Sequence, residues 1–154
     1  MDREILFRGK RKGYSDSWVE GFLAKKDLIF SWSETSMEEI FGGEKKDDGT
    51  YFYNSYPVRP ETVGQYTGLK DVFGKKIYEG DIVEVTCKFK GKVEFENCGV
   101  VEYKGNAFEL NIFTDDEDFN FPIYESVCNS EREDTFIVIG NIHDNPELLE
   151  DNND

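Results

Sequence analysis

The sequence predicts a mostly β fold, and three observations support that prediction. Aromatic residues make up 15% of the chain, with thirteen Phe and eight Tyr, and such side chains favour the pleated, half-buried surface of a sheet. Short runs of alternating apolar and polar residues recur between turn-forming residues. A chain of 154 residues can also bury a core without disulfides or a structural metal. We therefore expect one small β domain, or two.

The N-terminal region, predicted as residues 1–58, begins with two or three strands. Extended runs cover 5–10, 18–24 and 28–32, and the glycine, serine and aspartate residues of 13–17 favour a turn after the first. Residues 34–50 are polar and glycine-containing, so we expect a loop with at most one short helical turn. Strand character resumes at 51–58 and ends before Pro60.

The remaining region, residues 59–154, holds the most regular strand pattern. Val83, Val85, Cys87 and Phe89 alternate with polar residues and should share one face of a strand. Further strands are expected over the apolar runs at 99–105, 107–113, 121–127 and 136–142. In the second of these runs, Phe108, Leu110 and Ile112 should share a face. The last run is almost continuously apolar, which is typical of a strand buried on both faces.

One helix has clear sequence signals, and it follows the last strand. Asn145 can cap the helix, Pro146 suits the first helical position, and Glu147 lies near the positive end of the helix dipole. The remaining segment is long enough for about one or two turns. We therefore expect a short helical turn after residue 145.

The segment 64–85 places glycines at positions 64, 68, 74 and 80. Their spacing fits neither a Walker A loop nor a dinucleotide-binding fingerprint, and the segment leads into a strand instead of a helix. We therefore expect a corner of a small barrel and no phosphate site. Gly68 and Gly74 should adopt positive φ, and residues 79–81 should form a tight turn.

Charge and cysteine content limit the classes of function. The net charge of −15 disfavours nucleic-acid binding by the chain as a whole. Residues 1–26 hold seven Lys and Arg against four acids, which we interpret as a solvated hairpin. The three cysteines form no C-x-x-C pair, so neither a disulfide framework nor a zinc knuckle is expected. With no apolar segment of membrane-spanning length and no signal peptide, we expect a cytoplasmic protein.

Three separated segments carry a family resemblance. Residues 60–85 read PETVGQYTGLKDVFGKKIYEGDIVEV, residues 3–23 contain REILFRGKRK and WVEGFL, and residues 136–150 read FIVIGNIHDNPELLE. Together they resemble the YopX family of phage and prophage proteins. One departure is Ile137, where that family often has Glu. The matched positions that we expect to be structural or to face a partner are Gly64, Gln65, Tyr66, Thr67, Gly68, Asp71, Gly74, Tyr78, Gly80, Asp81, Gly140, Asn141, Asn145 and Pro146.

The resemblance implies a small SH3-like β-barrel with an additional N-terminal β region. It also implies a protein encoded by a phage or prophage and acting in a bacterial host. It implies no catalytic residue and no cofactor, because the family is described as one of unknown function.

Few residues of the sequence suggest a catalytic or metal-binding role. His143 is the only histidine; it could act as a general base beside Asp144 or a thiol, but a packing or capping role is favoured. Cys87, Cys98 and Cys128 are interpreted as buried small apolar residues rather than nucleophiles. The acidic run 115–118 lacks the glycine and terminal glutamate of an EF-hand, which favours a solvated turn.

Aromatic residues of the N-terminal region could line a peptide groove, although their period-2 spacing favours core packing. They are Trp18, Phe22, Phe30, Trp32, Tyr51, Tyr53 and Tyr56.

The leading hypothesis is a non-enzymatic protein-interaction module that binds an unidentified host or phage protein and could also self-associate. The first alternative is an acidic nucleic-acid mimic that inhibits a host DNA-binding enzyme. A small hydrolase or thiol enzyme is the least favoured class. No direct nucleic-acid or membrane partner is expected.

Overall fold

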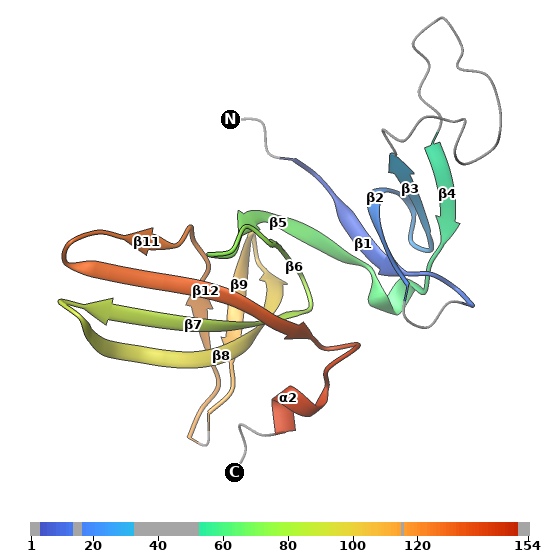
Figure 1. The fold of residues 1–154 in the computed structure, drawn as a ribbon. Coiled ribbons are helices and arrows are strands. Elements are labelled where there is room, and N and C mark those ends of the chain that lie inside the picture. The colour runs from blue at the N-terminus through green and yellow to red at the C-terminus, as the bar shows by residue number, and fades with distance from the viewer. Residues whose placement is uncertain (1–3, 14–16, 33–52, 115, 151–154) are drawn as a thin grey trace, which may run out of the picture. The chain divides into compact units, whose positions relative to one another are not determined.

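The computed structural model describes residues 4–13, 17–32, 53–114 and 116–150. The chain packs as two compact units, Ile5–Gln65 and Tyr66–Asp154, the second taking in Met1–Glu4 as well. Nearly all regular structure is antiparallel β, with one 3₁₀ helix and one short α-helix among the described residues (Figure 1). The mostly β prediction is therefore confirmed. The predicted domain boundary between 58 and 59 stays a prediction, because a compact unit need not fold independently.

The 5–65 unit is built on a four-stranded antiparallel arrangement in the order β4-β3-β2-β1, to which the first residues of β5 add. The strands are β1 (Phe7–Lys10), β2 (Trp18–Lys25), β3 (Leu28–Trp32) and β4 (Tyr53–Pro57). The sequence predicted all four to within a few residues. The expected turn within 13–17 and the expected loop at 34–50 fall mainly outside the described residues.

The core of this unit includes Ile29 and Val58, which are fully buried. Gly9 allows that packing, since a Cβ there would lie 3.0 Å from the Val58 Cβ. After Val58, Pro60–Thr62 form the 3₁₀ helix η1. The Thr62 hydroxyl accepts a hydrogen bond from the Lys10 N–H at 2.8 Å, which fastens η1 to β1.

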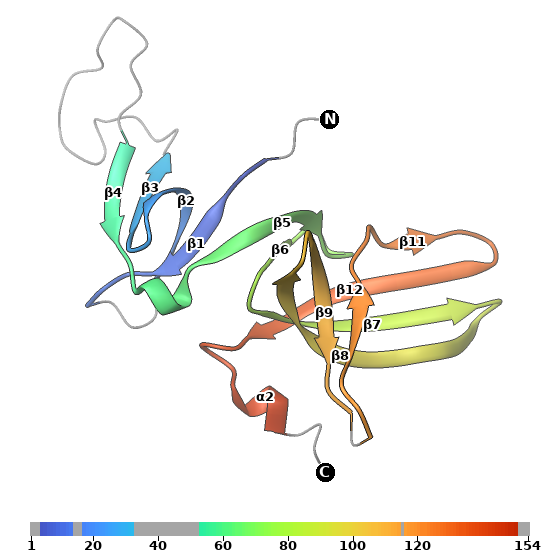
Figure 2. The same cartoon turned by 180° about the vertical axis from the view of Figure 1, so that it is seen from behind.

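The 66–154 unit is built on a six-stranded sheet in the order β10-β9-β8-β7-β12-β11. Figure 2 shows its long strands β7, β8 and β12 side by side. The strands are β7 (Asp81–Phe89), β8 (Lys92–Lys104), β9 (Ala107–Ile112), β10 (Phe119–Pro122), β11 (Val127–Cys128) and β12 (Arg132–Asn141).

Two further strands, β5 (Gly64–Lys70) and β6 (Lys76–Tyr78), form a hairpin, and β5 spans the boundary between the units. The sequence did not predict β5, because glycines weaken a strand signal. The structure shows how a strand accommodates this glycine: Gly68 has φ 87° and lies in a register shift between Tyr66 and Lys70. The predicted positive φ of Gly68 and Gly74 is confirmed, but the first occurs within a strand as a bulge.

The core of this unit draws on five strands: Ile77, Val83, Val85, Val101, Leu110, Ile112 and Phe136. The Phe121 ring on β10 lies 6.4 Å from the Phe136 ring on β12, although three strands separate β10 from β12 in the sheet. The sheet is therefore strongly curled. The ladder pairs of the described strands do not join β10 to β11, so the SH3-like barrel stays a prediction.

Two burial predictions are wrong in part. The last strand is not buried on both faces, since Ile139 of β12 is 40% exposed, because only one face of β12 packs on the core. Phe89 continues the alternation of Val83 and Val85 but is exposed. A register shift between Cys87 and Lys88 interrupts the ladder, so the buried face does not extend to the end of β7.

The predicted terminal helix is confirmed as α2 (Glu147–Glu150). The Leu148 N–H donates to the Asn145 carbonyl at 3.1 Å, so the turn begins at the predicted cap. Among the described residues, no helix has both the length and the apolar character needed to span a membrane.

Candidate functional site

The residues that match the family motifs form two groups of turn-stabilising contacts in the 66–154 unit. The first group surrounds Asp71, which is 7% exposed. Its Oδ1 accepts hydrogen bonds from the N–H groups of Phe73 and Lys75 at 2.9 and 2.8 Å. Its Oδ2 accepts one from the Val138 N–H at 3.2 Å. A single carboxylate thus shapes the β5–β6 tip and fastens it to β12.

A second bond fastens the same tip, since the Val72 N–H donates to the Phe136 carbonyl at 3.0 Å. Strand β11 pairs with β12 only up to Asp134. Beyond that point, Asp71 and Val72 form hydrogen bonds with the Val138 N–H and the Phe136 carbonyl on the edge of β12. A neighbouring strand would otherwise pair with these backbone groups. The tip therefore protects a strand edge.

Thr67 and the neighbouring residues shape β5 around its bulge. The Thr67 hydroxyl donates to the Ile77 carbonyl at 2.8 Å and accepts from the Leu69 N–H at 3.1 Å. The rings of Tyr66 and Tyr78 pack at 5.5 Å between centroids. In the other unit, Gly64 and Gln65 belong to β5 and face β1 residues in the ladder.

The second group joins the turn at 79–81 to the segment that follows β12. Gly80 has φ 87°. Its N–H donates to the Val101 carbonyl at 2.9 Å, and its carbonyl accepts from the Ile142 N–H at 3.0 Å. Asp81, 1% exposed, accepts a hydrogen bond from the Tyr78 N–H at 2.8 Å. The family motifs around Gly80 and around Ile142 are therefore in contact in the structure, although they are far apart in sequence. The sequence did not predict this contact.

Asn141 organises the segment after β12. Its Oδ1 accepts from the N–H groups of His143 and Asp144 at 3.0 and 2.9 Å, while its own N–H donates to Asn145 Oδ1 at 3.3 Å. A Cβ on Gly140 would lie 2.7 Å from that same Asn145 oxygen. A side chain at position 140 would therefore displace the Asn145 side chain from its bond with the Asn141 N–H, and Pro146 follows as the start of the helical turn.

His143 lies against the Gly80 turn, with Nε2 3.9 Å from where a Cβ on Gly80 would be. Its N–H belongs to the Asn141 turn. This placement agrees with the predicted packing role. The polar groups of Thr67, Asp71, Asp81 and Asn141 likewise bond backbone groups, so the matched positions form a framework for turns.

Around Cys87 the structure places a polar cluster that the sequence did not predict. The Tyr124 hydroxyl donates to Asp134 Oδ2 at 2.9 Å, and the Arg132 guanidinium contacts the same oxygen. Burial and Asp134 raise the pKa of the Cys87 thiol. Burial and the hydrogen bond to Asp134 raise the pKa of Tyr124 to about 12. Both groups stay protonated at neutral pH, which disfavours a thiolate nucleophile.

The cysteines are less buried than predicted. Cys87 and Cys98 are half-buried and Cys128 is exposed. Cys87 lies towards the end of β7 and Cys128 on a short edge strand, whereas Cys98 pairs with Glu84 on the face of the sheet opposite Val83 and Val85. In the acidic run, Asp116, Glu117 and Asp118 are exposed, and Thr114 closes the turn by bonding Glu117. Asp115 lies outside the described residues. No group of three potential metal ligands gathers among the residues with described positions.

The Glu79 carboxyl group, next to Gly80, has a raised pKa. Partial burial raises it first, and the neighbouring Glu102 carboxylate adds to the effect. Glu102 itself pairs with Lys104 at 3.1 Å and accepts a hydrogen bond from Asn111. The two carboxylates are therefore close enough to repel one another. Within the described part of the chain, no third potential metal ligand joins them.

In the N-terminal unit, cations lie over aromatic rings. The Arg8 guanidinium lies 4.8 Å from the Trp18 ring centre, and that of Arg11 lies 4.7 Å from the Tyr56 ring centre. Trp18 and Tyr56 are half-buried, whereas Phe22 is 46% exposed. The predicted core packing of the aromatic set therefore holds only in part. Side chains of Phe30, Trp32, Tyr51 and Tyr53 lie outside the described residues.

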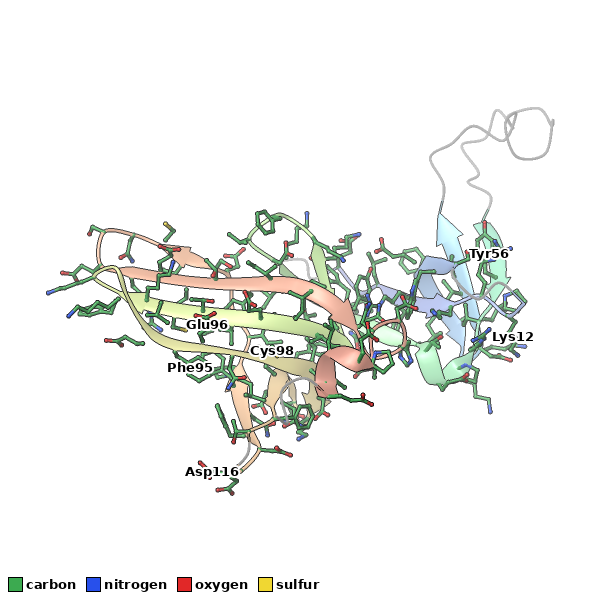
Figure 3. All side chains as sticks on the ribbon, turned by 60° about the horizontal axis from the view of Figure 1, so that its bottom comes forward. Lys12, Tyr56, Phe95, Glu96, Cys98 and Asp116 are labelled. Atoms are coloured by element: carbon green, nitrogen blue, oxygen red, sulfur yellow. The ribbon has the colours of Figure 1, made fainter. Side chains whose placement is uncertain are left out.

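Sequence reasoning missed several exposed apolar side chains of the 66–154 unit. Phe73, at the tip fastened by Asp71, is 79% exposed, and Val72 beside it is 45% exposed. Val93 and Phe119 are exposed on β8 and β10, where the Phe119 ring contacts that of Phe95. A phenylalanine directly before the tip glycine was the available signal. Figure 3 shows Phe95 and Glu96 on β8, with Asp116 at the turn between β9 and β10.

Comparisons with known proteins agree with this fold. A family model described as YopX protein matches residues 8–150. The crystal structure of protein EF1440 from Enterococcus faecalis is similar, with a TM-score of 0.50 and 21% sequence identity over 96% of this chain and 99% of that chain. At that identity the likeness shows the fold alone. No curated protein matches the chain.

Proposed function

The chain belongs to the YopX protein family, and on that premise we propose that it is a non-enzymatic protein-interaction module of a phage or prophage, acting in the host cytoplasm. The observation that carries the proposal is the exposure of large apolar side chains at two places in the 66–154 unit, led by Phe73 at 79%. Exposed apolar side chains that gather in one place mark interaction surfaces. Rigid aromatic side chains are also the common anchors of protein interfaces.

The arrangement of the matched residues supports this proposal. Asp71, Asp81 and Asn141 use their side chains to bond backbone N–H groups of turns. Such residues fix the conformation of the turns, and the exposed side chains on those turns are then available to bind a partner. Phe73 is one of those, two residues after Asp71.

The raised pKa of the Cys87 thiol and the structural role of the His143 backbone support a non-enzymatic role. A nucleophilic cysteine needs an environment that favours the thiolate. Beside Cys87 the carboxylate of Asp134 has the opposite effect.

We also propose that the 66–154 unit is a small SH3-like barrel. The curling of its sheet supports this, since Phe121 of β10 and Phe136 of β12 meet at 6.4 Å across the interior. Small barrels fill their interior with such side chains and leave their loops for recognition.

The charge distribution favours one alternative, an acidic mimic of nucleic acid. Residues 66–154 hold eight Lys and Arg against 21 Asp and Glu, a net charge of −13, whereas residues 5–65 hold nine against ten. Such a field could occupy the basic groove of a host DNA-binding enzyme. That binding would weaken steeply with salt.

A capture experiment tests both candidates. The tagged protein, and a matched variant with both Phe73→Ser and Phe119→Ser, are immobilised and exposed to host lysate, then washed at low and high salt. A stoichiometric protein captured by the wild type and lost by the variant supports the interaction module. Capture of a DNA-binding enzyme by both proteins, lost at high salt, supports the mimic instead. Absence of any captured protein, together with a monomeric state in solution, contradicts both.

A further inference from the structure

The two exposed apolar surfaces of the 66–154 unit differ in the charges around them. The Phe73 tip, defined as Val72 and Phe73 with flanking Lys70 and Lys75, combines apolar and basic side chains. All four are exposed. The acid within this segment, Asp71, is buried against three backbone N–H groups. The tip therefore presents positive charge in a unit whose net charge is −13, from eight Lys and Arg against 21 Asp and Glu.

The Phe73 tip is also held in one shape. Asp71 bonds the backbone on both sides of Phe73, and the Val72 N–H donates to the Phe136 carbonyl at 3.0 Å. A tip fixed before binding loses little conformational entropy when it docks. Phe73 is thus suited to act as an anchor residue.

The second surface, the β8–β10 patch, is defined as Phe95 and Phe119, which lie on the face of the sheet that holds their ladder partners Cys87 and Ile112. Phe119 is 40% exposed and Phe95 is half-buried, whereas the exposed Val93 pairs with Lys88 and projects from the opposite face of the sheet. The Phe95 ring packs edge-on against Phe119 at 6.1 Å and stacks on Phe121 at 5.1 Å between centroids. The rings of the patch are therefore packed against one another, and among the described residues no helix or strand covers them.

Acidic residues border the β8–β10 patch. Asp116, Glu117 and Asp118 directly precede Phe119, in the turn between β9 and β10. All three are exposed. Lys104, whose ammonium group lies 3.4 Å from the side-chain oxygen of Asn120, is a basic exception. The patch therefore combines apolar area with a net negative border, which is the complement of the Phe73 tip.

We propose that the Phe73 tip of one molecule docks on the β8–β10 patch of a second copy of this chain. The inference rests on the proposed interaction function and names the partner. Phe73 contacts the rings of Phe95 and Phe119, while Lys70 and Lys75 lie near the acidic border. The two surfaces are different, so the contact is head-to-tail, and each molecule keeps one free tip and one free patch. Such contacts extend into rings or open chains.

A complementation experiment in sedimentation velocity tests this contact. Wild-type protein should show association that grows with concentration over about 10 to 200 µM and weakens as salt rises from about 0.05 to 0.5 M. Phe73→Ser and Phe119→Ser should each be monomeric. Their equimolar mixture should form a one-to-one dimer, because one variant retains the patch and the other retains the tip. Ile139→Ser, at an exposed position outside both surfaces, should associate like the wild type.

Folding of each variant is checked by circular dichroism, and Phe73→Leu, which keeps an apolar anchor, should retain association. A wild type that stays monomeric throughout the range overturns the inference. A self-associating wild type whose two variants fail to complement each other also overturns it, since that result indicates a symmetric contact. If the wild type is monomeric but lysate capture finds a partner that depends on Phe73, the proposed function stands and the second copy is excluded as that partner.

Discussion

The two hairpin tips of the 66–154 unit both present apolar side chains between lysines, yet they are held in different ways. The β5–β6 tip is fastened to β12 by the Asp71 carboxylate and by Val72. The β7–β8 tip turns through Lys90 and Gly91, with φ values of 48° and 77°. There, the Lys90 N–H donates to the Glu131 carbonyl at 2.6 Å. The short β7–β8 turn is thus set by two backbone angles and one backbone hydrogen bond, whereas the longer β5–β6 loop is fixed by a buried carboxylate that accepts several N–H groups.

The largest effect should come from removing that acceptor. Asp71→Ala leaves the N–H groups of Phe73, Lys75 and Val138 without their acceptor, and we expect a loss of about 3 kcal/mol in the free energy of unfolding. Urea denaturation measures it. Asp116→Ala, which removes an exposed carboxylate, is the matched control and should change stability by less than about 0.5 kcal/mol. Equal stability of the two variants would mean that the buried carboxylate does not hold the tip.

The tip glycines offer a matched pair. Gly74 and Gly91 have φ values of 85° and 77°, and a Cβ on either would meet nothing within 4 Å. Alanine at each position therefore adds only backbone strain, and we expect both variants to lose about 1 kcal/mol. Thermal unfolding of the two proteins compares them directly. A much larger loss for Gly74→Ala would show that the Asp71 contacts make their loop less able to adjust than the β7–β8 turn.

Glu79 contrasts with Asp71, because the pKa of Glu79 is raised by partial burial and by Glu102. A carboxyl group with a raised folded-state pKa lowers stability once pH exceeds its unfolded-state pKa, and the penalty is complete above the folded-state pKa. Glu79→Gln should therefore raise the melting temperature at pH 7. The advantage should disappear as pH falls below the ordinary glutamate pKa, about 4.3. A melting-temperature difference independent of pH would show that ionisation of Glu79 is not what lowers stability.

The smallest effect is expected at the base of the β7–β8 tip. Lys88 and Glu133 form an ion pair at 3.2 Å with both side chains partly exposed to solvent. Because exposed pairs contribute little, Lys88→Ala should cost no more than about 0.5 kcal/mol, and added salt should reduce even that difference. Denaturant melts at two salt concentrations measure the effect. A loss comparable to that of Asp71→Ala would mean that side-chain contacts, and not turn geometry, hold this tip.

The local parts of the fold could be predicted from sequence. Extended runs bounded by turn residues located the strands of the 5–65 unit, and Asn145 with Pro146 located α2, since these signals depend on neighbours in the chain. The bond between Asp71 and Val138 joins residues 67 positions apart, which no local pattern encodes. Strand β5 was missed for a related reason, because Gly68 serves a bulge that becomes evident only when β5 pairs with β6.

The candidate site was less predictable than the fold. The sequence indicated which positions match the family motifs, and the structure shows that Asp71, Asp81 and Asn141 serve backbone turns. Exposure of Phe73 could not be deduced, because an apolar residue in a glycine-rich loop is equally consistent with burial under that loop. The acidic border of the β8–β10 patch likewise depends on pairing between β8, β9 and β10.

The place of β12 in the sheet has a consequence for newly synthesised chains. β7 pairs with β12 along most of its length, and β12 begins at Arg132, 43 positions after β7 ends at Phe89. At ordinary rates of translation, the first residue of β12 is added roughly 2 to 9 s after the last residue of β7. During that time one edge of β7 has no native neighbour, and open strand edges can pair with other chains. A nascent polypeptide therefore passes through an interval in which chaperone capture on the ribosome competes with misassembly between adjacent nascent chains.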